Sequence, residues 1–447
     1  MTNRLRYLFR IFSSLASVPA CAVALACTVT AAAPAQSTPA THWTASWGAA
    51  QQIPEPQNAL SDADLTLATL RETVHLSTGG SALRVHLSNA FGTTPLRFTA
   101  VHIALALVPG QSAIDPATDR PVLFSGSEQV TVPAGAEYIS DPVSLPVAPL
   151  ANLAVTFSLD QPPQQQTGHP GSRATTFLAH GFPVSAPSMP AETLPGEAMP
   201  GPAMSVSSQG AVKSVEHWYF LSGIDVAAST LNPASIVALG DSITDGHATT
   251  TNGNDRWTDV LAQRVQADPA TRGIGIVNAG IGGNHLLTDG LGPNALARFD
   301  RDVLARPGAK WVIVFEGVND LGALARAANA TPAQHTDLVQ RILAAYQQII
   351  ARAHAQGLLV YGATITPYVG SDYYHPDALS EADRQQINAS IRNSIHFDAL
   401  IDFDQVVRDP DHPDRLLPAF DCGDHLHPSP AGYRAMGQAI PLNLFRP

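Results

Sequence analysis

The pattern of hydrophobic and polar residues divides the chain into two parts. From about Thr41 to Ala228, short runs alternate apolar and polar residues, as half-buried antiparallel strands do. The predicted strands are Leu70–Ser77, Ala82–Asn89, Leu96–Leu107, Ala151–Leu159 and His217–Val226. Glycine and proline turns separate them, which predicts a β-sandwich of the jelly-roll type. Most of Gln161–Gln209, rich in Pro, Gln, Ser and Met, is expected to form surface loops.

From about Ser229, apolar strands alternate with amphipathic helices. The predicted strands are Ser235–Leu239, Ile274–Asn278, Trp311–Glu316, Leu358–Thr364 and Ala399–Phe403. The predicted helices are Arg256–Ala267, Ala295–Ala305, Pro332–Ala355, Ser380–Ser394 and a last one from about Ser429. This alternation predicts a parallel sheet with helices on both faces. We therefore expect a β-sandwich domain at 41–228 and an α/β domain at 229–447.

The N-terminus has the pattern of a secretory signal. Three arginines precede a largely apolar stretch from Ile11 to about Ala31, and Ala33–Ala35 (APA) supplies a small-x-small cleavage pattern. A signal peptide at 1–35 would make the protein secreted or periplasmic. An uncleaved anchor and a lipoprotein cleavage before Cys27 are the alternatives. No later segment is long and apolar enough to span a bilayer, so we expect no stable membrane insertion after cleavage.

Composition narrows the class of protein and of ligand. With 45% hydrophobic and 14% charged residues, the chain should be globular, and its net charge of -12 argues against binding to nucleic acid or an anionic membrane. Two of the three cysteines lie in the signal, so Cys422 is expected to be a free, buried packing residue. The histidines are scattered, and His425 and His427 lack a third ligand at metal spacing. No metal or other cofactor is expected.

Two short motifs carry the candidate chemistry. Gly240–Gly246 (GDSITDG) follows a predicted strand and places Ser242 at the mouth of an open parallel sheet, where ligands collect in α/β folds. Gly423–Pro428 (GDHLHP) supplies His427 as a base, with Asp424 three residues earlier to orient it. Taken alone, the second motif also fits an aspartate that caps the following helix. Together the motifs indicate a serine hydrolase.

Two further segments follow predicted strands. Asn278–Asn284 (NAGIGGN) brings glycine amides close to a ligand, although a tight strand-to-helix turn has the same pattern. Gly317–Asp320 (GVND) contains Asn319, which can donate to an oxyanion or cap the next turn. The glycine spacing is not a dinucleotide fingerprint, and no Gly-x-Ser-x-Gly elbow of the α/β-hydrolase type is present.

In this order, the blocks of Ser242, Gly283, Asn319 and His427 resemble the four-block signature of the GDSL/SGNH hydrolase family. The resemblance implies a flavodoxin-like doubly wound sheet, a triad of Ser242, His427 and Asp424, and an oxyanion hole of the Ser242 and Gly283 amides with the Asn319 side chain. Asn254–Trp257, Gly283–Leu287, Ala297–Asp300 and Ser371–Tyr374 resemble a secreted two-domain subgroup with xylan-associated arylesterases and acylhydrolases.

The sequence therefore predicts a secreted serine esterase that cleaves carboxylic esters through an acyl-enzyme. By resemblance, its substrate is a small-molecule or polysaccharide ester, with short acyl groups on carbohydrate. Tyr373, Tyr374 and His375 follow the fourth predicted strand of the α/β part and are candidates to line the substrate pocket. The alternatives are a lysophospholipase or thioesterase, and a carbohydrate-binding protein with a silent hydrolase domain.

Overall fold

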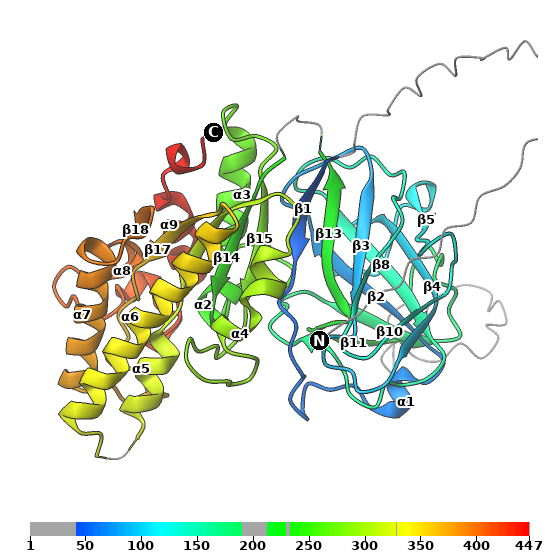
Figure 1. The fold of residues 1–447 in the computed structure, drawn as a ribbon. Helices are drawn as coiled ribbons and strands as arrows, with labels where there is room; N and C mark the ends of the chain where they lie inside the picture. Colours follow the sequence, from blue (N-terminus) through cyan, green and yellow to red (C-terminus); the bar gives the residue numbers. More distant parts are fainter. Residues whose placement is uncertain (1–41, 190–211, 229–232, 328, 447) are drawn as a thin grey trace, which may run out of the picture. The chain divides into compact units, whose positions relative to one another are not determined.

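The structure is a computed structural model, which describes residues 42–189, 212–228, 233–327 and 329–446. The expected signal peptide lies outside these residues, as does the expected boundary near residue 229. Thr41–Pro447 form one compact unit. It contains a doubly wound α/β part preceded by a β-sandwich, so the predicted fold class is confirmed (Figure 1). The division of this unit into two domains at residue 228 stays a prediction.

The β-sandwich consists of two antiparallel sheets. The first has the strand order β1 (Trp43–Gly48), β13 (Leu221–Ala227), β3 (Leu83–Ser88) and β7 (Glu137–Ile139). The second has the order β11 (Lys213–Val215), β10 (Thr176–His180), β2 (Ala68–His75), β8 (Asn152–Leu159), β4 (Leu96–Leu105) and β5 (Arg120–Pro121), and β6 (Val130–Val132) also pairs with β4. A short ladder joins β9 (Gly168–His169) to β12 (Trp218–Tyr219). Short helical turns are α1 (Asp62–Leu65) and Pro116–Thr118.

Large apolar side chains fill the space between the sheets. Phe98 and Phe157 from the second sheet and Phe220, which precedes β13, pack edge to face and are fully buried. Such aromatic contacts bury much apolar surface and favour one arrangement of the rings. They hold the two sheets together as one core.

The expectation of surface loops in Gln161–Gln209 is wrong for part of that segment. Thr176–His180 forms β10, which lies between β11 and β2 inside the second sheet, and Gly168–His169 forms β9. The strand is only five residues long, four of them are buried, and it stands among prolines and glutamines, so it shows no alternation that would have marked it in the sequence. Residues 190–211 lie outside the described part.

The α/β part is built on a parallel sheet. Its strand order is β15 (Gly275–Gly280), β14 (Ser235–Gly240), β16 (Ala309–Phe315), β17 (Leu359–Ala363) and β18 (Ala399–Ile401). These strands are mostly apolar because helices cover both faces of the sheet. The chain order reverses at β14, and ligands of open α/β sheets bind beside such a reversal, beyond the carboxyl ends of the strands.

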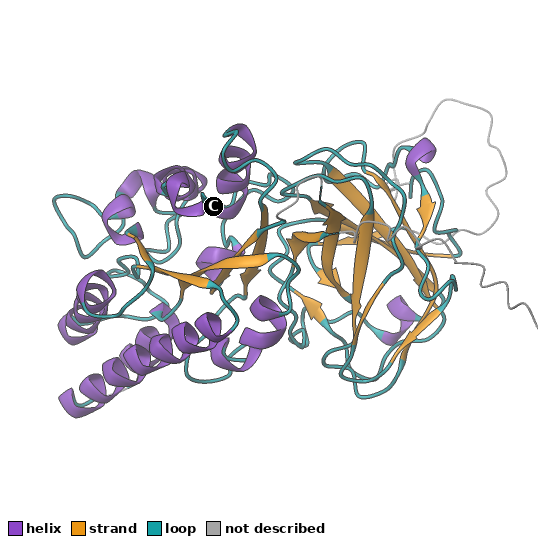
Figure 2. Ribbon diagram, turned by 45° about the horizontal axis from the view of Figure 1, so that its top comes forward, coloured by secondary structure: helices purple, strands orange, loops and turns teal. Residues whose placement is uncertain are grey.

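Helices cover both sides of this sheet (Figure 2). In one group, α9 (Pro430–Ala439) contacts α3 (Trp257–Ala267) and α8 (Phe403–Val407). In the other, α6 (Pro332–Ala355) contacts α4 (Ala295–Phe299), α5 (Val318–Ala325) and α7 (Ala378–Asn393). Shorter turns are α2 (Ser242–Asp245), Pro418–Phe420 and Leu442–Phe445. The predicted helix Ala295–Ala305 changes after Phe299 into a π-helical turn over Asp300–Leu304.

Strand β1 of the sandwich runs along the outer edge of β15 (Figure 1). The approach is close, because a Cβ added at Gly275 would stand 2.0 Å from the carbonyl oxygen of Ala45. The Ile276 amide on this edge donates to the hydroxyl of Ser77, at 2.7 Å. The β-sandwich thus covers an edge that would otherwise expose unpaired backbone groups.

Candidate active site

Each predicted site residue follows a strand or precedes a helix of the α/β part. Ser242 is the first residue of α2, directly after β14, and Gly283 lies in the turn after β15. Asn319 is the second residue of α5, after β16. Asp424 and His427 lie in the loop that leads into α9. The structure thus gathers blocks up to 185 residues apart at the carboxyl end of one sheet.

A chain of short contacts links serine, histidine and aspartate. The Ser242 Oγ lies 2.8 Å from Nε2 of His427, and Nδ1 of the same ring lies 2.6 Å from Oδ2 of Asp424. A carboxylate only accepts hydrogen bonds, so Nδ1 carries the proton and Nε2 is free to accept one from the serine. His427 is 8% exposed, so little water competes for the ring.

The carboxylate of Asp424 is fixed by its own loop. Its Oδ1 accepts the amides of Leu426 and His427, at 2.9 and 2.8 Å. Partial burial favours the neutral acid, but the hydrogen bonds and charge of His427 outweigh it, and the pKa of Asp424 lies well below its ordinary value. Asp424 is therefore ionised at neutral pH and holds the imidazole in one tautomer.

The serine turn is positioned by the residues next to it. The Asp241 side chain caps α2 by accepting the amide of Ile243, at 2.9 Å. Arg298 is fully buried. Its guanidinium donates to the carbonyl of Gly240, the last residue of β14, and to that of Ala279, the last residue but one of β15. It also binds the side chain of Asn284, at 2.7 Å. One guanidinium thus joins the strand ends on which the site is built.

Several carboxyl groups are buried around Arg298. Glu316 faces its guanidinium at 3.4 Å, while Asp320 accepts the amides of Leu286 and Leu287. Burial raises the pKa of Asp241 to about 7 and also raises the pKa of Glu316 and Asp320. At neutral pH, therefore, not all of these carboxyl groups are ionised, and the negative charge beside Ser242 is smaller than their number suggests.

Asn319 is held in one orientation from two sides. Its Nδ2 donates to the carbonyl of Asn284, at 2.6 Å, and its Oδ1 accepts the hydroxyl of Tyr374, at 2.6 Å. The amide group has a second N–H, which remains for a bound oxyanion. Gly283 has a φ of +66°, a conformation that favours glycine, and its amide and that of Ser242 have no protein acceptor among the described residues.

The three candidate lining residues lie in different surroundings. Tyr373 is 60% exposed and its ring is covered on one side by the Arg326 guanidinium, 4.6 Å from the ring centroid. His375 is exposed. Tyr374 is 4% exposed and contacts Asn319. The structure brings Tyr374 into the site through Asn319, and the substrate-lining role of all three residues stays a prediction.

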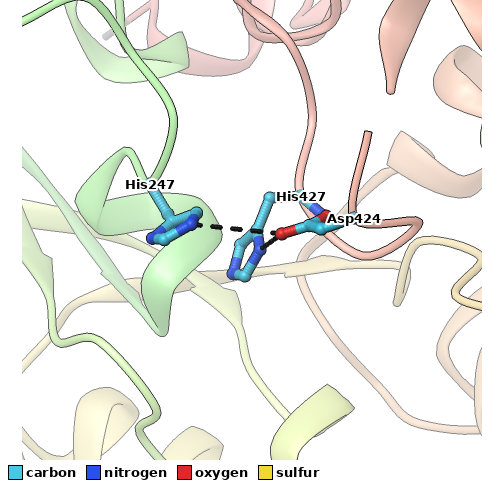
Figure 3. Close-up of side chains that lie close together, drawn as sticks. All are labelled: His247, Asp424 and His427. Carbon is cyan, nitrogen blue, oxygen red and sulfur yellow. Dashed lines mark hydrogen bonds and ion pairs between the residues drawn. The ribbon is translucent and has the colours of Figure 1, made fainter. Parts of the chain in front are cut away.

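The motifs of the sequence do not indicate His247, which lies beside His427 and Asp424 (Figure 3). Its ring centroid is 4.0 Å from that of His427, and its Nε2 is 4.0 Å from Oδ2 of Asp424. Burial lowers the pKa of His247, and so does repulsion from the His427 ring when that ring is protonated. The three side chains lie close enough to share a metal ion. Both ring nitrogens of His427, however, already face Ser242 and Asp424.

Residues 238–435 match the model of the GDSL-like lipase/acylhydrolase family. The chain carries a GDSL hydrolase domain. This confirms the resemblance drawn from the motifs, and the GDSL domain includes every residue of the geometry described above. Members of this family hydrolyse ester bonds, so the matched part of this chain is that of an ester hydrolase.

Solved structures resemble part of this chain at low identity. A GDSL-like lipase from Bacteroides thetaiotaomicron is 19% identical, with 47% of this chain and 89% of that chain covered and a TM-score of 0.33. The aryl esterase of M. smegmatis is 18% identical, over 46% and 95%, with a TM-score of 0.35. An acetyl xylan esterase from Geobacillus stearothermophilus is 19% identical, over 47% and 94%, with a TM-score of 0.34. No protein of curated function matches the sequence.

One expectation near the GDSL domain's histidine loop is wrong. Cys422 is exposed and not a buried packing residue, and the next residue, Gly423, is exposed as well. Its amide donates to the carbonyl of His427, at 3.1 Å, so its backbone supports the loop.

Among the described residues, no helix has the length and apolar composition needed to span a bilayer.

Proposed function

We propose that the protein is a secreted serine esterase that cleaves carboxylic esters through an acyl-enzyme. The observation that carries this proposal is the unbroken set of contacts from Ser242 Oγ through His427 to Asp424. A serine hydroxyl is a weak nucleophile until a base removes its proton. This arrangement supplies the base, and the ionised aspartate stabilises the imidazolium that forms.

The proposed reaction has two steps. Ser242 Oγ attacks the ester carbonyl while His427 takes its proton, and the oxyanion is bound by the Ser242 and Gly283 amides and by Asn319 Nδ2. His427 then protonates the departing alcohol, which leaves the acyl group on Ser242. In the second step His427 deprotonates water, the water attacks the acyl group, and the acid departs as the proton returns to Ser242.

We propose short acyl groups on carbohydrate as the substrate. This rests on the resemblance of Asn254–Trp257 and Ser371–Tyr374 to the secreted subgroup, and on Tyr373, an exposed aromatic ring beside the residue that binds Asn319. A lipid acylhydrolase is the second candidate. Leu291 favours it, because this leucine is 51% exposed and a Cβ on Gly283 would stand 3.3 Å from it. A long acyl chain would meet this apolar surface.

Hydrolysis of p-nitrophenyl acetate, butyrate and octanoate tests the reaction. The full mature chain should hydrolyse acetate fastest, and Ser242→Ala and His427→Gln should abolish turnover. His425→Gln is the matched control, since His425 lies two residues away and, within the described part of the chain, its ring pairs with Asp421 alone, at 2.6 Å. Preference for octanoate would favour the lipid candidate. Equal activity in Ser242→Ala and wild type would refute the serine esterase and support the binding-protein alternative.

Two further measurements test the finer parts of the proposal. Release of acetate from acetylated xylan, compared with release from p-nitrophenyl acetate, tests the carbohydrate substrate. N-terminal sequencing of protein recovered outside the cytoplasm tests secretion, and a mature chain that begins at Gln36 is expected. A chain that retains Met1 would contradict the signal peptide.

A further inference from the structure

The turn that carries Ser242 is bound by the β-sandwich. Asp245 ends this turn, and its Oδ1 lies 2.8 Å from Nε2 of His169 in β9, a residue 76 positions earlier. Both side chains are almost fully buried, at 3% and 7% exposed. A Cβ added at Gly171 would stand 1.8 Å from the other oxygen, Oδ2. The Asp245 carboxylate thus fits against a short segment of the sandwich that lacks a side chain at that point.

The contacts of His169 define its charge. Nδ1 lies 2.7 Å from the carbonyl oxygen of Ala50, and Nε2 faces the carboxylate of Asp245. Both partners only accept hydrogen bonds, so both ring nitrogens must donate and the ring is an imidazolium. Burial opposes this charge, but Asp245 outweighs it and raises the pKa of His169. The pair is a buried ion pair between the sandwich and the serine turn.

A second residue holds the same turn. The Nε of Arg256, at the start of α3, donates to the backbone carbonyl of Asp245, at 2.7 Å, and its Nη2 donates to the carbonyl of Ser172. Arg173 donates to Thr249 in the loop after the turn. His169 therefore holds the side chain of Asp245, and Arg256 holds its backbone. His169 belongs to the segment 169–173, and Arg256 binds that segment at Ser172.

We propose that His169 is a positioning residue: its ion pair with Asp245 fixes the turn of α2 so that Ser242 Oγ stays in reach of His427. The turn has only four residues, so Asp245 and Ser242 move together. The turn also presses on the end of β15, where a Cβ on Gly280 would stand 2.3 Å from the Asp245 amide. A shift at Asp245 therefore moves the serine. This inference rests on the proposed function of Ser242.

The test is the kinetics of His169→Gln, Asp245→Asn and the double variant on p-nitrophenyl acetate. We expect kcat to fall about 10- to 100-fold in each single variant, with KM little changed, because small misplacement of a nucleophile costs this much. Labelling of Ser242 by a fluorophosphonate should slow in parallel. All three variants break the same ion pair between His169 and Asp245. The kcat of the double variant should therefore be no lower than that of the slower single variant. A residue that only stabilises the fold would alter unfolding but not kcat.

The matched control is His102→Gln. His102 pairs with Asp119, at 2.9 Å, entirely within the sandwich, and its loss should leave kcat unchanged. If His169→Gln does not fold, Asp245→Asn decides, because it keeps the size of the side chain. Wild-type kcat in folded His169→Gln and Asp245→Asn would refute the positioning role. If Ser242→Ala also kept wild-type activity, the proposed function itself would be refuted. If Ser242→Ala lost activity while His169→Gln and Asp245→Asn kept it, only the positioning role would be refuted.

Discussion

Replacement of Tyr374 by phenylalanine tests whether the orientation of Asn319 matters for turnover. Burial raises the pKa of Tyr374, so its hydroxyl stays protonated and donates to Asn319 Oδ1, at 2.6 Å. Both residues are buried, at 4% and 2% exposed, so no water would replace the lost donor. Tyr374→Phe removes one oxygen atom and leaves the ring where it packs against Gly322.

The magnitude follows from the contacts that remain. A buried acceptor left without a donor costs about 1–3 kcal/mol of stability. Loss of a complete oxyanion donor, as in Asn319→Ala, costs on the order of 100-fold in kcat. In Tyr374→Phe the amide keeps its bond to the Asn284 carbonyl, so only its freedom to turn increases. We expect kcat to fall about tenfold, which corresponds to about 1.4 kcal/mol.

The assay compares kcat on p-nitrophenyl acetate with the free energy of unfolding in urea. Tyr368→Phe is the matched control, because Tyr368 is fully buried nearby and its hydroxyl has no partner within the described part of the chain. Removal of that hydroxyl should leave kcat unchanged and should not destabilise the protein. If Tyr374→Phe behaves like Tyr368→Phe in both measurements, the proposed orientation of Asn319 is refuted.

Three further predictions concern titratable groups. Asp424→Asn should lower kcat by about 100-fold or more. The Asp424 carboxylate should stabilise the protein fully above its ordinary pKa of 3.8, and this stabilisation should disappear as the pH falls through the depressed pKa of the folded state. The free energies of unfolding in urea of wild type and variant should therefore converge in acid. His86 is buried, which disfavours its charge, but Asp225 and Glu137 outweigh this and raise the pKa of His86 to about 9. Below pH 6.5 the free energy of unfolding of wild type should exceed that of His86→Gln by at most about 3 kcal/mol. This difference should close as the pH rises through 9, and a difference that stays constant with pH would contradict the charged pair. Partial burial raises the pKa of Cys422 to about 11, so Cys422→Ser should keep wild-type kcat, and rapid labelling by iodoacetamide at about pH 8 would contradict a protonated thiol.

The sequence predicted the parts of the site that are encoded locally. GDSITDG places a serine after a buried strand, and an aspartate three residues before a histidine can reach it through its own loop. Short motifs therefore predicted that Ser242, Asp424 and His427 lie together, while their catalytic roles stay a prediction. The helix Pro332–Ala355 was predicted to the residue, because Thr331 caps it, a proline begins it and its apolar positions repeat with helical period.

Contacts between distant segments left no such pattern. Nothing in the neighbourhood of Gly168–Ala174, in a segment rich in proline and glutamine, indicates that His169 meets Asp245. The bond from Tyr374 to Asn319 joins a loop to the start of α5, 55 residues earlier in the chain. His247 stands outside the GDSITDG motif, and its contact with His427 depends on how the last loop folds back. These contacts are set by tertiary packing, which periodicity does not report.

The covered edge of β15 has a consequence for solubility. A shortened chain beginning at about residue 233 would keep every strand of the parallel sheet and all residues of the proposed triad, yet it would lose β1 and Ser77 from the flank of Ile276. The bare edge would then offer a row of amides and carbonyls to another copy of the same strand, and chains would join edge to edge. The sandwich therefore shields the edge of β15 from this association.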